Sequence, residues 1–155
     1  MSLERIDAPD IPAGFNEIAF SARGDFIELV GPLYGGRTEN GKSAMGFRVE
    51  QRHCHSGKTC NGGMLLTLAD ILLPVAIQRD AGYTGGFLVT VSLSADFLRP
   101  APMGSWVDGV ADVLSNAGRL RFCQCIIRSD RDMAVRVSAV FKETRTKVPY
   151  PPLEF

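Results

Sequence analysis

The amino-acid sequence predicts an α+β fold in which a curled antiparallel sheet of about six strands wraps around one long central helix. Two observations carry this prediction. Residues 60–78 are apolar around almost the whole helical wheel, and four strand-like segments follow them along the chain. A helix that is apolar on every side must be covered on every side, and a sheet that curls around it achieves this with one layer.

The chain has 155 residues, which suits one domain with a full hydrophobic core. We expect a single domain over 1–155, with an irregular lead-in at 1–24 and a proline-rich tail at 147–155. Lysine plus arginine balance aspartate plus glutamate at 17 each, so the overall charge favours neither nucleic acid nor a membrane surface as a partner. The apolar helix is short for a membrane span and the N-terminus has no signal-like pattern, so we expect a soluble, cytoplasmic protein.

The cysteines show no disulfide framework, so reduced thiols are expected. Two of them lie close in sequence to both histidines of the chain, in a group formed by His53, Cys54, His55 and Cys60. This group lacks the paired C-x-x-C or H-x-x-x-H spacing of zinc sites. We therefore expect no metal site.

Two strands are predicted before the helix. Residues 26–30 (FIELV) are rich in β-forming residues and predict the first strand. Residues 31–42 contain four glycines and a proline, which is typical of a turn-rich connection. Residues 43–51 alternate between apolar and polar side chains and predict the second, half-buried strand.

The start of the long helix has an unusual sequence. Asn61 is a good N-cap, and Gly62 and Gly63 follow it although glycine disfavours helix interiors. Two glycines here indicate close approach of another group to the backbone, where the first N–H groups of a helix attract negative charge. The alternative is that they only form a flexible turn.

Asp70 is the anomaly of this helix, because only Thr67 and Asp70 are polar between Gly63 and Gln78. Burying a carboxylate in a core costs free energy of folding unless hydrogen-bond donors contact it. Acids in such surroundings are often found at functional sites. The alternative is a structural role, in which Asp70 caps a neighbouring backbone group. Pro74 should kink the helix or loosen its second half.

Four strands are predicted after the helix. Residues 87–98 alternate strictly, which places the odd-numbered side chains on an apolar face and Thr90 on the opposite, polar face. Residues 106–114 and 120–128 are joined by a hairpin turn, and 133–143 form the last strand.

A set of residues within 43–143 carries a resemblance to a known family. The set consists of His55, Asn61-Gly62-Gly63, Asp70, Thr90 and Leu98-Arg99-Pro100. It resembles the motif of the hotdog-fold acyl-CoA thioesterases of the phenylacetate-pathway (PaaI-like) type. The chain departs from that motif in its polar pair, because the family has Asn and then His where this sequence has His55 and then Asn61.

The resemblance implies roles for five of these residues. The backbone N–H of Gly62 polarises the thioester carbonyl, and Asp70 acts as general base or nucleophile. Asn61, His55 and Thr90 complete the catalytic set. Thr90 has the alternative of an ordinary solvated side chain, and His55 that of a plain loop histidine.

The substrate implied by the resemblance is an acyl-CoA. We expect Gly63, Thr67, Arg99 and Arg119 to bind it, and arginine in particular suits the phosphates of coenzyme A, a chemistry that Arg121 shares. Coenzyme A is then part of the substrate, and no separate cofactor is expected.

The spacing of Gly62 and Asp70 predicts self-association. Eight helical residues at about 1.5 Å each separate the two by about 12 Å, so one helix cannot bring both to one carbonyl group. If they cooperate, they come from two subunits of a dimer with two equivalent sites. The resemblance implies the same arrangement, often as a dimer of dimers.

Two other functions fit parts of the sequence. A non-catalytic acyl-CoA-binding protein is compatible with the exchanged His55 and Asn61. A hotdog dehydratase or hydratase usually needs an acid and a histidine in the helix, and this helix contains no histidine.

Overall fold

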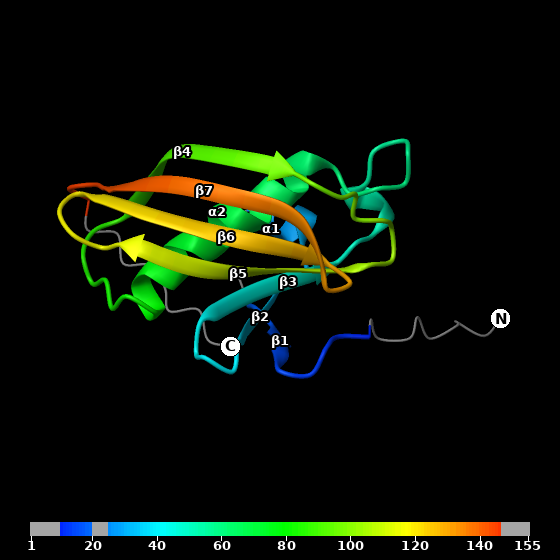
Figure 1. Ribbon diagram of the computed structural model, residues 1–155, viewed down its shortest axis with the longest axis horizontal. Helices are drawn as coiled ribbons and strands as arrows, with labels where there is room; N and C mark the ends of the chain where they lie inside the picture. The colour runs from blue at the N-terminus through cyan, green and yellow to red at the C-terminus, as the bar shows by residue number, and fades with distance from the viewer. Residues whose placement is uncertain (1–9, 20–24, 147–155) are drawn as a thin grey trace.

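The computed structural model describes residues 10–19 and 25–146. Antiparallel strands form one seven-stranded sheet in the order β1-β2-β3-β5-β6-β7-β4, and the long helix α2 lies along one face of it (Figure 1). This arrangement confirms the predicted fold class. The elements are β1 (Phe15–Glu17), α1 (Asp25–Val30), β2 (Tyr34–Arg37), β3 (Ser43–Arg48), the 3₁₀ helix η1 (Gln51–His53), α2 (Gly62–Arg79), β4 (Leu88–Phe97), β5 (Trp106–Ser115), β6 (Leu120–Ser129) and β7 (Asp132–Glu143).

Helix α2 is the centre of the hydrophobic core. Leu68, Leu72 and Ile77 are fully buried, and the sheet contributes equally buried side chains such as Phe47 and Phe141. By length and mean hydropathy α2 is also able to span a membrane, so the expectation that it is too short for this was wrong. In this structure it packs as the core helix of the sheet.

Residues 26–30 form helix α1 and not the predicted strand. Ile27 and Val30, three residues apart, pack against the core, whereas Phe26 and Leu29 are exposed. That spacing is the period of a helix. The strand prediction was wrong because β-propensity depends strongly on context. Here the packing of Ile27 and Val30 against the core favours a helix over a strand.

Two short strands lie where irregular structure was predicted. Because the predicted strand at 26–30 is a helix, the number of strands rises only by one, from about six to seven. β1 falls in the lead-in and β2 in the turn-rich connection. Gly36 of β2 pairs with Phe15 of β1, and a Cβ atom on Gly36 would lie 2.6 Å from the carbonyl oxygen of Gly14. Glycine therefore lets the two strands approach, and does not mark a turn here.

The other strands lie close to their predicted positions. β5, β6 and β7 begin and end within one residue of the predicted bounds, and β3 ends earlier because η1 follows it. Residues 1–9 and 20–24 of the predicted lead-in, and the predicted tail at 147–155, lie outside the described residues.

β4 departs from strict alternation. It is an edge strand that pairs with β7, and the pairing register shifts between Thr90 and Ser92. Before the shift, the even-numbered Leu88 is buried and Val89 is exposed. After the shift, an odd-numbered residue, Leu93, packs against the core. Such a bulge re-aims side chains, so Thr90 shares the inner face with Leu88. The predicted apolar face of odd-numbered residues is wrong for the first part of the strand.

Candidate active site

The N-terminus of α2 presents one unused backbone donor. The Asn61 side-chain oxygen accepts a hydrogen bond from the Gly63 N–H at 2.8 Å, and the Asn61 carbonyl accepts from the Met64 N–H at 2.9 Å. The Gly62 N–H donates to no acceptor within residues 10–19 and 25–146. It lies at the helix end where the partial positive charge of the dipole is greatest. This N–H can polarise a carbonyl group of a ligand.

Phe97, at the end of β4, covers Gly62. A Cβ atom on Gly62 would lie 3.0 Å from Cε1 and 3.1 Å from Cζ of this ring. The glycine therefore permits close packing of helix and ring, as its position in the sequence suggested. Phe97 was not among the predicted site residues, and no local pattern identifies it, because its contact with Gly62 joins two elements that are far apart in the chain.

Asp70 lies beside β4 and accepts a hydrogen bond from the Thr90 hydroxyl at 2.6 Å. Thr90 reaches it because β4 is an edge strand and carries the bulge just after this residue. Asp70 is half-buried, as are Thr67 and Ile71, so α2 is not buried on every side as predicted. Ile71 still packs against the core, and the half-burial of Asp70 leaves its carboxylate accessible.

Pro74 gives Asp70 a second distinguishing feature. Residue i+4 of a helix normally donates its N–H to the carbonyl of residue i, and proline has no N–H. The carbonyl of Asp70 thus lacks its helical donor, although α2 continues through Pro74 to Arg79.

The two central groups of the candidate site do not meet within one chain. Gly62 lies against Phe97, and Asp70 lies against Thr90, seven residues back along the same strand. Gly62 and Asp70 are eight residues apart in α2, which separates them by about 12 Å at about 1.5 Å per residue. Gly62 and Asp70 therefore act together only if a second chain supplies one of them.

The structure gives the two histidines of the 53–60 group different surroundings. His55 is exposed, and its ring nitrogens bond within the loop, to the Gly57 N–H at 2.9 Å and to the Thr59 hydroxyl at 2.6 Å. No hydrogen bond joins its ring to Asn61 or Gly62 in the described residues. His53 is buried against Phe47, and its ring bonds the Glu50 N–H at 3.0 Å and the Val30 carbonyl at 2.7 Å.

His53 should make the protein less stable in mild acid. Burial lowers the pKa of His53 below its ordinary value, so the unfolded chain takes up a proton near pH 6.5 that the folded chain does not. The free energy of unfolding should fall as pH drops below about 6.5. Urea unfolding midpoints on either side of that pH measure this, and a His53→Gln variant should show a weaker pH dependence. An equal dependence in both proteins contradicts this role.

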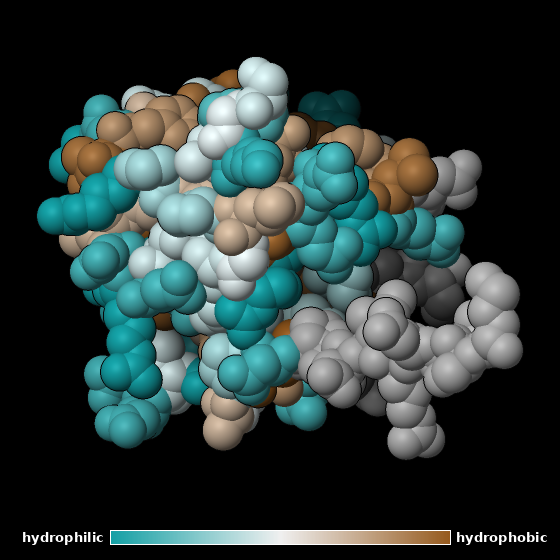
Figure 2. All heavy atoms as spheres, turned by 90° about the vertical axis from the view of Figure 1, so that its right-hand side faces the viewer, coloured by the Kyte–Doolittle hydropathy of each residue, from teal (hydrophilic) through white to brown (hydrophobic). Residues whose placement is uncertain are grey.

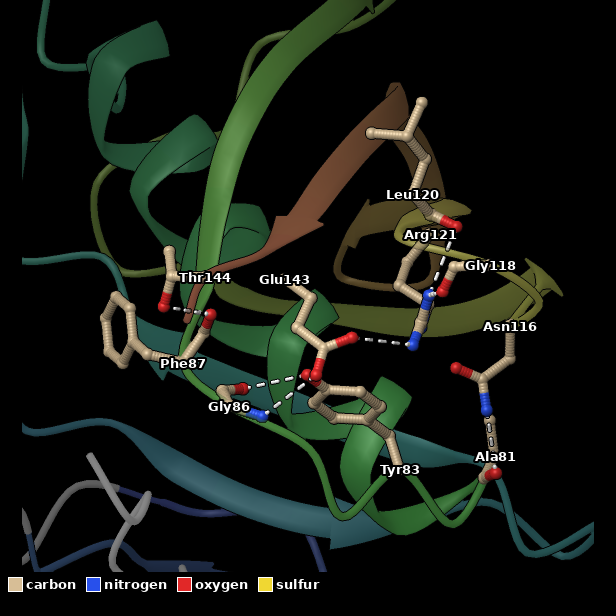
Figure 3. Close-up of polar contacts among 10 residues, drawn as sticks. All are labelled: Ala81, Tyr83, Gly86, Phe87, Asn116, Gly118, Leu120, Arg121, Glu143 and Thr144. Atoms are coloured by element: carbon tan, nitrogen blue, oxygen red, sulfur yellow. Dashed lines mark hydrogen bonds and ion pairs between the residues drawn. The ribbon is translucent and has the colours of Figure 1, made fainter. Parts of the chain in front are cut away.

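Arg121 does not have the phosphate-binding role considered for it. Its side chain is buried, lies over the Tyr83 ring at 4.7 Å, and pairs with Glu143 at 3.7 Å (Figure 3). It also donates to the carbonyl of Gly118. Inward-facing residues of β6 alternate with outward-facing ones. Arg121 has the same parity as the buried Cys123 and Cys125, so this alternation could have predicted from the sequence that Arg121 faces inward.

The remaining predicted substrate-binding residues are spread over the molecule. Thr67 donates to the Gly63 carbonyl at 2.9 Å, which keeps both at the start of α2. Arg99 follows β4 and donates to the Met133 carbonyl at 3.2 Å. Arg119 precedes β6, at the other end of the sheet, where its carbonyl accepts from the Glu143 N–H. One chain does not bring Arg99 and Arg119 together.

The described residues contain no group of three or more His, Cys, Asp or Glu side chains placed to hold a metal ion. The Cys54, His53 and His55 side chains instead bond to backbone and hydroxyl groups nearby.

A sheet that curls around one central helix is the hotdog fold, and here it places an unused N–H at the start of the helix and an acid, Asp70, beside the edge strand. Residues 57–135, half of the chain, match the model of the thioesterase superfamily, and the chain belongs to this family.

Individual proteins show the same relationship. A Pseudomonas aeruginosa protein that carries the name of an esterase, PA0474, is 28% identical over 134 residues, which cover 85% of this chain and 96% of that protein. A mutant of the phenylacetic acid degradation protein PaaI of Thermus thermophilus superimposes with a TM-score of 0.65 at 21% identity, over 77% of this chain and 98% of that one. A Streptococcus pneumoniae protein described as a hypothetical thioesterase, solved with coenzyme A, gives 0.62 at 13% identity, over 75% and 88%.

Proposed function

We propose that the protein is an acyl-CoA thioesterase, acting in the cytoplasm, that hydrolyses the thioester of an acyl- or aryl-CoA to the free acid and coenzyme A. The observation that carries this proposal is the pair formed by the unused Gly62 N–H and the accessible Asp70, which Thr90 orients. Thioester hydrolysis needs a donor for the developing oxyanion and a base or nucleophile on the other side of the carbonyl. These two groups have those properties.

The proposed site forms between two copies of the chain. Thr90 and Phe97 lie at equal distances from the midpoint between Leu93 and Ser94 on β4. If two β4 edges pair antiparallel about a twofold axis at that midpoint, Thr90 of one copy lies opposite Phe97 of the other. Asp70 then lies near Gly62 of the partner subunit, and the symmetry produces two such sites.

The surface of β4 supports this pairing. β4 is the last strand of the sheet that the described residues form, and two of its apolar side chains are exposed, Val91 at 55% and Phe97 at 53%. A long edge strand with exposed apolar side chains is a template for pairing with another chain. Seen from the end where α2 begins, hydrophobic surface is most evident in the upper half of the molecule, where β4 runs (Figures 1 and 2).

The proposed reaction uses only these groups and water. The Gly62 N–H donates to the thioester oxygen while Asp70 removes a proton from a water molecule, whose oxygen bonds to the carbonyl carbon. The tetrahedral intermediate then expels the sulfur of coenzyme A, which receives the proton from Asp70. In the alternative, the Asp70 carboxylate itself attacks the carbonyl carbon, and the C–S bond breaks to release coenzyme A as its thiolate. Water then cleaves the resulting anhydride, which frees the acid, restores the carboxylate and supplies the proton that the thiolate takes up.

The antiparallel dimer also provides a place for the coenzyme A phosphates. In this dimer, the end of each sheet that carries Arg99 lies beside the opposite end of the partner sheet, which carries Arg119. Arginine binds phosphate with two parallel hydrogen bonds. The streptococcal structure with coenzyme A shows that a similar fold accommodates this group.

A thiol-release screen tests the proposed function. The protein is incubated with aromatic, short-chain and long-chain acyl-CoA esters, and free coenzyme A is measured against protein-only and substrate-only controls. We expect release well above the uncatalysed rate for at least one class. Calorimetric binding of acyl-CoA without release in any class would favour the non-catalytic binding protein instead.

Replacing Thr90 by valine should lower kcat/KM by about tenfold to a hundredfold, since a hydrogen bond to a charged group is worth about 1.5–3 kcal/mol. Valine keeps the shape of threonine and removes the hydroxyl that bonds Asp70 at 2.6 Å. Thr90→Ser, which keeps the hydroxyl, is the matched control and should stay close to wild type. Equal activity of Thr90→Val and Thr90→Ser would show that Thr90 does not orient Asp70.

A further inference from the structure

The loop that precedes α2 brings two cysteines opposite each other. Cys54 and Cys60 are the paired residues of an antiparallel bridge. The backbone hydrogen bonds of this bridge run between the flanking residues, from the His55 N–H to the Thr59 carbonyl at 3.1 Å and from the Asn61 N–H to the His53 carbonyl at 2.8 Å. The two cysteines are therefore a non-hydrogen-bonded pair, in which the Cα atoms lie about 4.5 Å apart and both side chains point to the same face.

Both thiols are reduced and lie on the core side of the loop. Cys60 is buried and belongs to the core, and Cys54 is half-buried and packs against it. Burial, with a contribution from the nearby Cys54, raises the pKa of the Cys60 thiol to about 12. The two sulfur atoms are thus near enough to influence each other, and Cys54 is the more accessible of them.

We propose that Cys54 and Cys60 form an oxidation site, at which a hydroperoxide converts the thiol pair into a disulfide that closes the loop 55–59. Disulfides join residues whose Cα atoms are about 4.4–6.8 Å apart, and a non-hydrogen-bonded pair meets this condition without backbone movement. This inference does not rest on the proposed thioesterase activity. Its consequence is local, because the bridged segment ends one residue before the helix cap Asn61 and two before Gly62.

The chemistry balances with one equivalent of hydroperoxide. The Cys54 sulfur attacks the O–O bond and takes up one oxygen as a sulfenic acid, and the other oxygen leaves as water or, for an organic peroxide, as the alcohol. The Cys60 sulfur then displaces the sulfenic hydroxyl, which leaves as water with the Cys60 proton. The two sulfurs lose two electrons and the peroxide gains them. Cys54 reacts first because its thiol is accessible and that of Cys60 is buried with a raised pKa.

Titration of the full-length protein with hydrogen peroxide tests the proposal. After each step the free thiols are blocked with N-ethylmaleimide, and the protein is unfolded and digested with trypsin. Trypsin cuts after Lys58, between the two cysteines, so a disulfide joins the separate peptides 53–58 and 59–79. We expect this joined pair, a loss of two blocked thiols, a mass lower by two hydrogen atoms, and full reversal by dithiothreitol.

Three variants make the result specific. Cys54→Ser keeps a hydroxyl within reach of the Glu50 carbonyl, 3.3 Å from the native sulfur, and should show no joined peptides. Cys60→Ala should accumulate a sulfenic acid at Cys54 that dimedone traps. Cys123→Ala, at a buried cysteine of β6, should behave as wild type. In the wild-type protein, four free thiols after treatment, irreversible oxygen addition at Cys54, or a disulfide that joins Cys54 or Cys60 to another cysteine instead would each overturn the proposal.

Discussion

Replacing Asp70 by asparagine is expected to lower thioester turnover on the order of 10³-fold, the range of a lost general base. Asparagine has the size of aspartate, and its side-chain oxygen still accepts the Thr90 hydroxyl that bonds Asp70 at 2.6 Å. It cannot take up a proton from water or form an anhydride. Because Asp70 is half-buried and not enclosed in the core, the substitution should leave the fold unchanged. Kcat/KM for thiol release measures the loss, and the urea midpoint and the mass in solution check the fold and the assembly.

An aspartate outside the site provides the matched control for this experiment. Asp112 of β5 is half-buried and pairs with Lys42 at 2.8 Å, and Lys42 lowers the pKa of its carboxyl group. Asp112→Asn makes the same chemical change far from Gly62 and should retain full turnover. Wild-type rates in Asp70→Asn would assign Asp70 a structural role and remove the base from the proposed mechanism.

The long helix and the last four strands were predictable because their signals are local. Between Gly63 and Gln78 the sequence of α2 is apolar except at Thr67 and Asp70, and β5, β6 and β7 alternate with clear turns between them. α1 and β1 were not predictable in this way. α1 is held by two side chains that reach a core formed by distant strands, and β1 pairs with β2 only because Gly36 allows the backbones to approach.

The residues of the candidate site also fall into those with a local sequence signal and those that depend on contacts between distant elements. Asp70 and Gly62 stand out in the sequence because each is unusual for its place in a helix, and Asn61 stands out because it is a favoured N-cap. The bond from Thr90 to Asp70 was not predictable from alternation, which places Thr90 on the outer face. The bulge that turns it inward is a property of the pairing between β4 and β7. Phe97 is similar, since its contact with Gly62 exists only in the folded chain.

Replacing Gly62 by proline is expected to lower turnover about 10²- to 10³-fold, the usual cost of one lost oxyanion donor. Proline removes the N–H, and that N–H makes no hydrogen bond in the described part of the chain. The first position of a helix favours proline, and the extended conformation of Asn61, with φ −62° and ψ 135°, suits a residue before proline. The helix should therefore form as before, which circular dichroism and the urea midpoint check.

Gly62→Ala separates the lost donor from added bulk. Alanine keeps the N–H and places its Cβ 3.0 Å from the Phe97 ring, so the ring must move by only a few tenths of an ångström. We expect Gly62→Ala to stay within a few-fold of wild type. Equal losses in the alanine and proline variants would mean that bulk, and not the N–H, explains the effect.

Mixing the two inactive proteins tests whether each site is shared between subunits. When Asp70→Asn and Gly62→Pro chains are unfolded together and refolded in equal amounts, half of the dimers combine one of each. In such a dimer one site has lost both groups, and the other has an intact Gly62 from one chain and an intact Asp70 from its partner. About a quarter of the wild-type activity should return. If instead each chain carries a complete site of its own, the mixture stays as inactive as its parts.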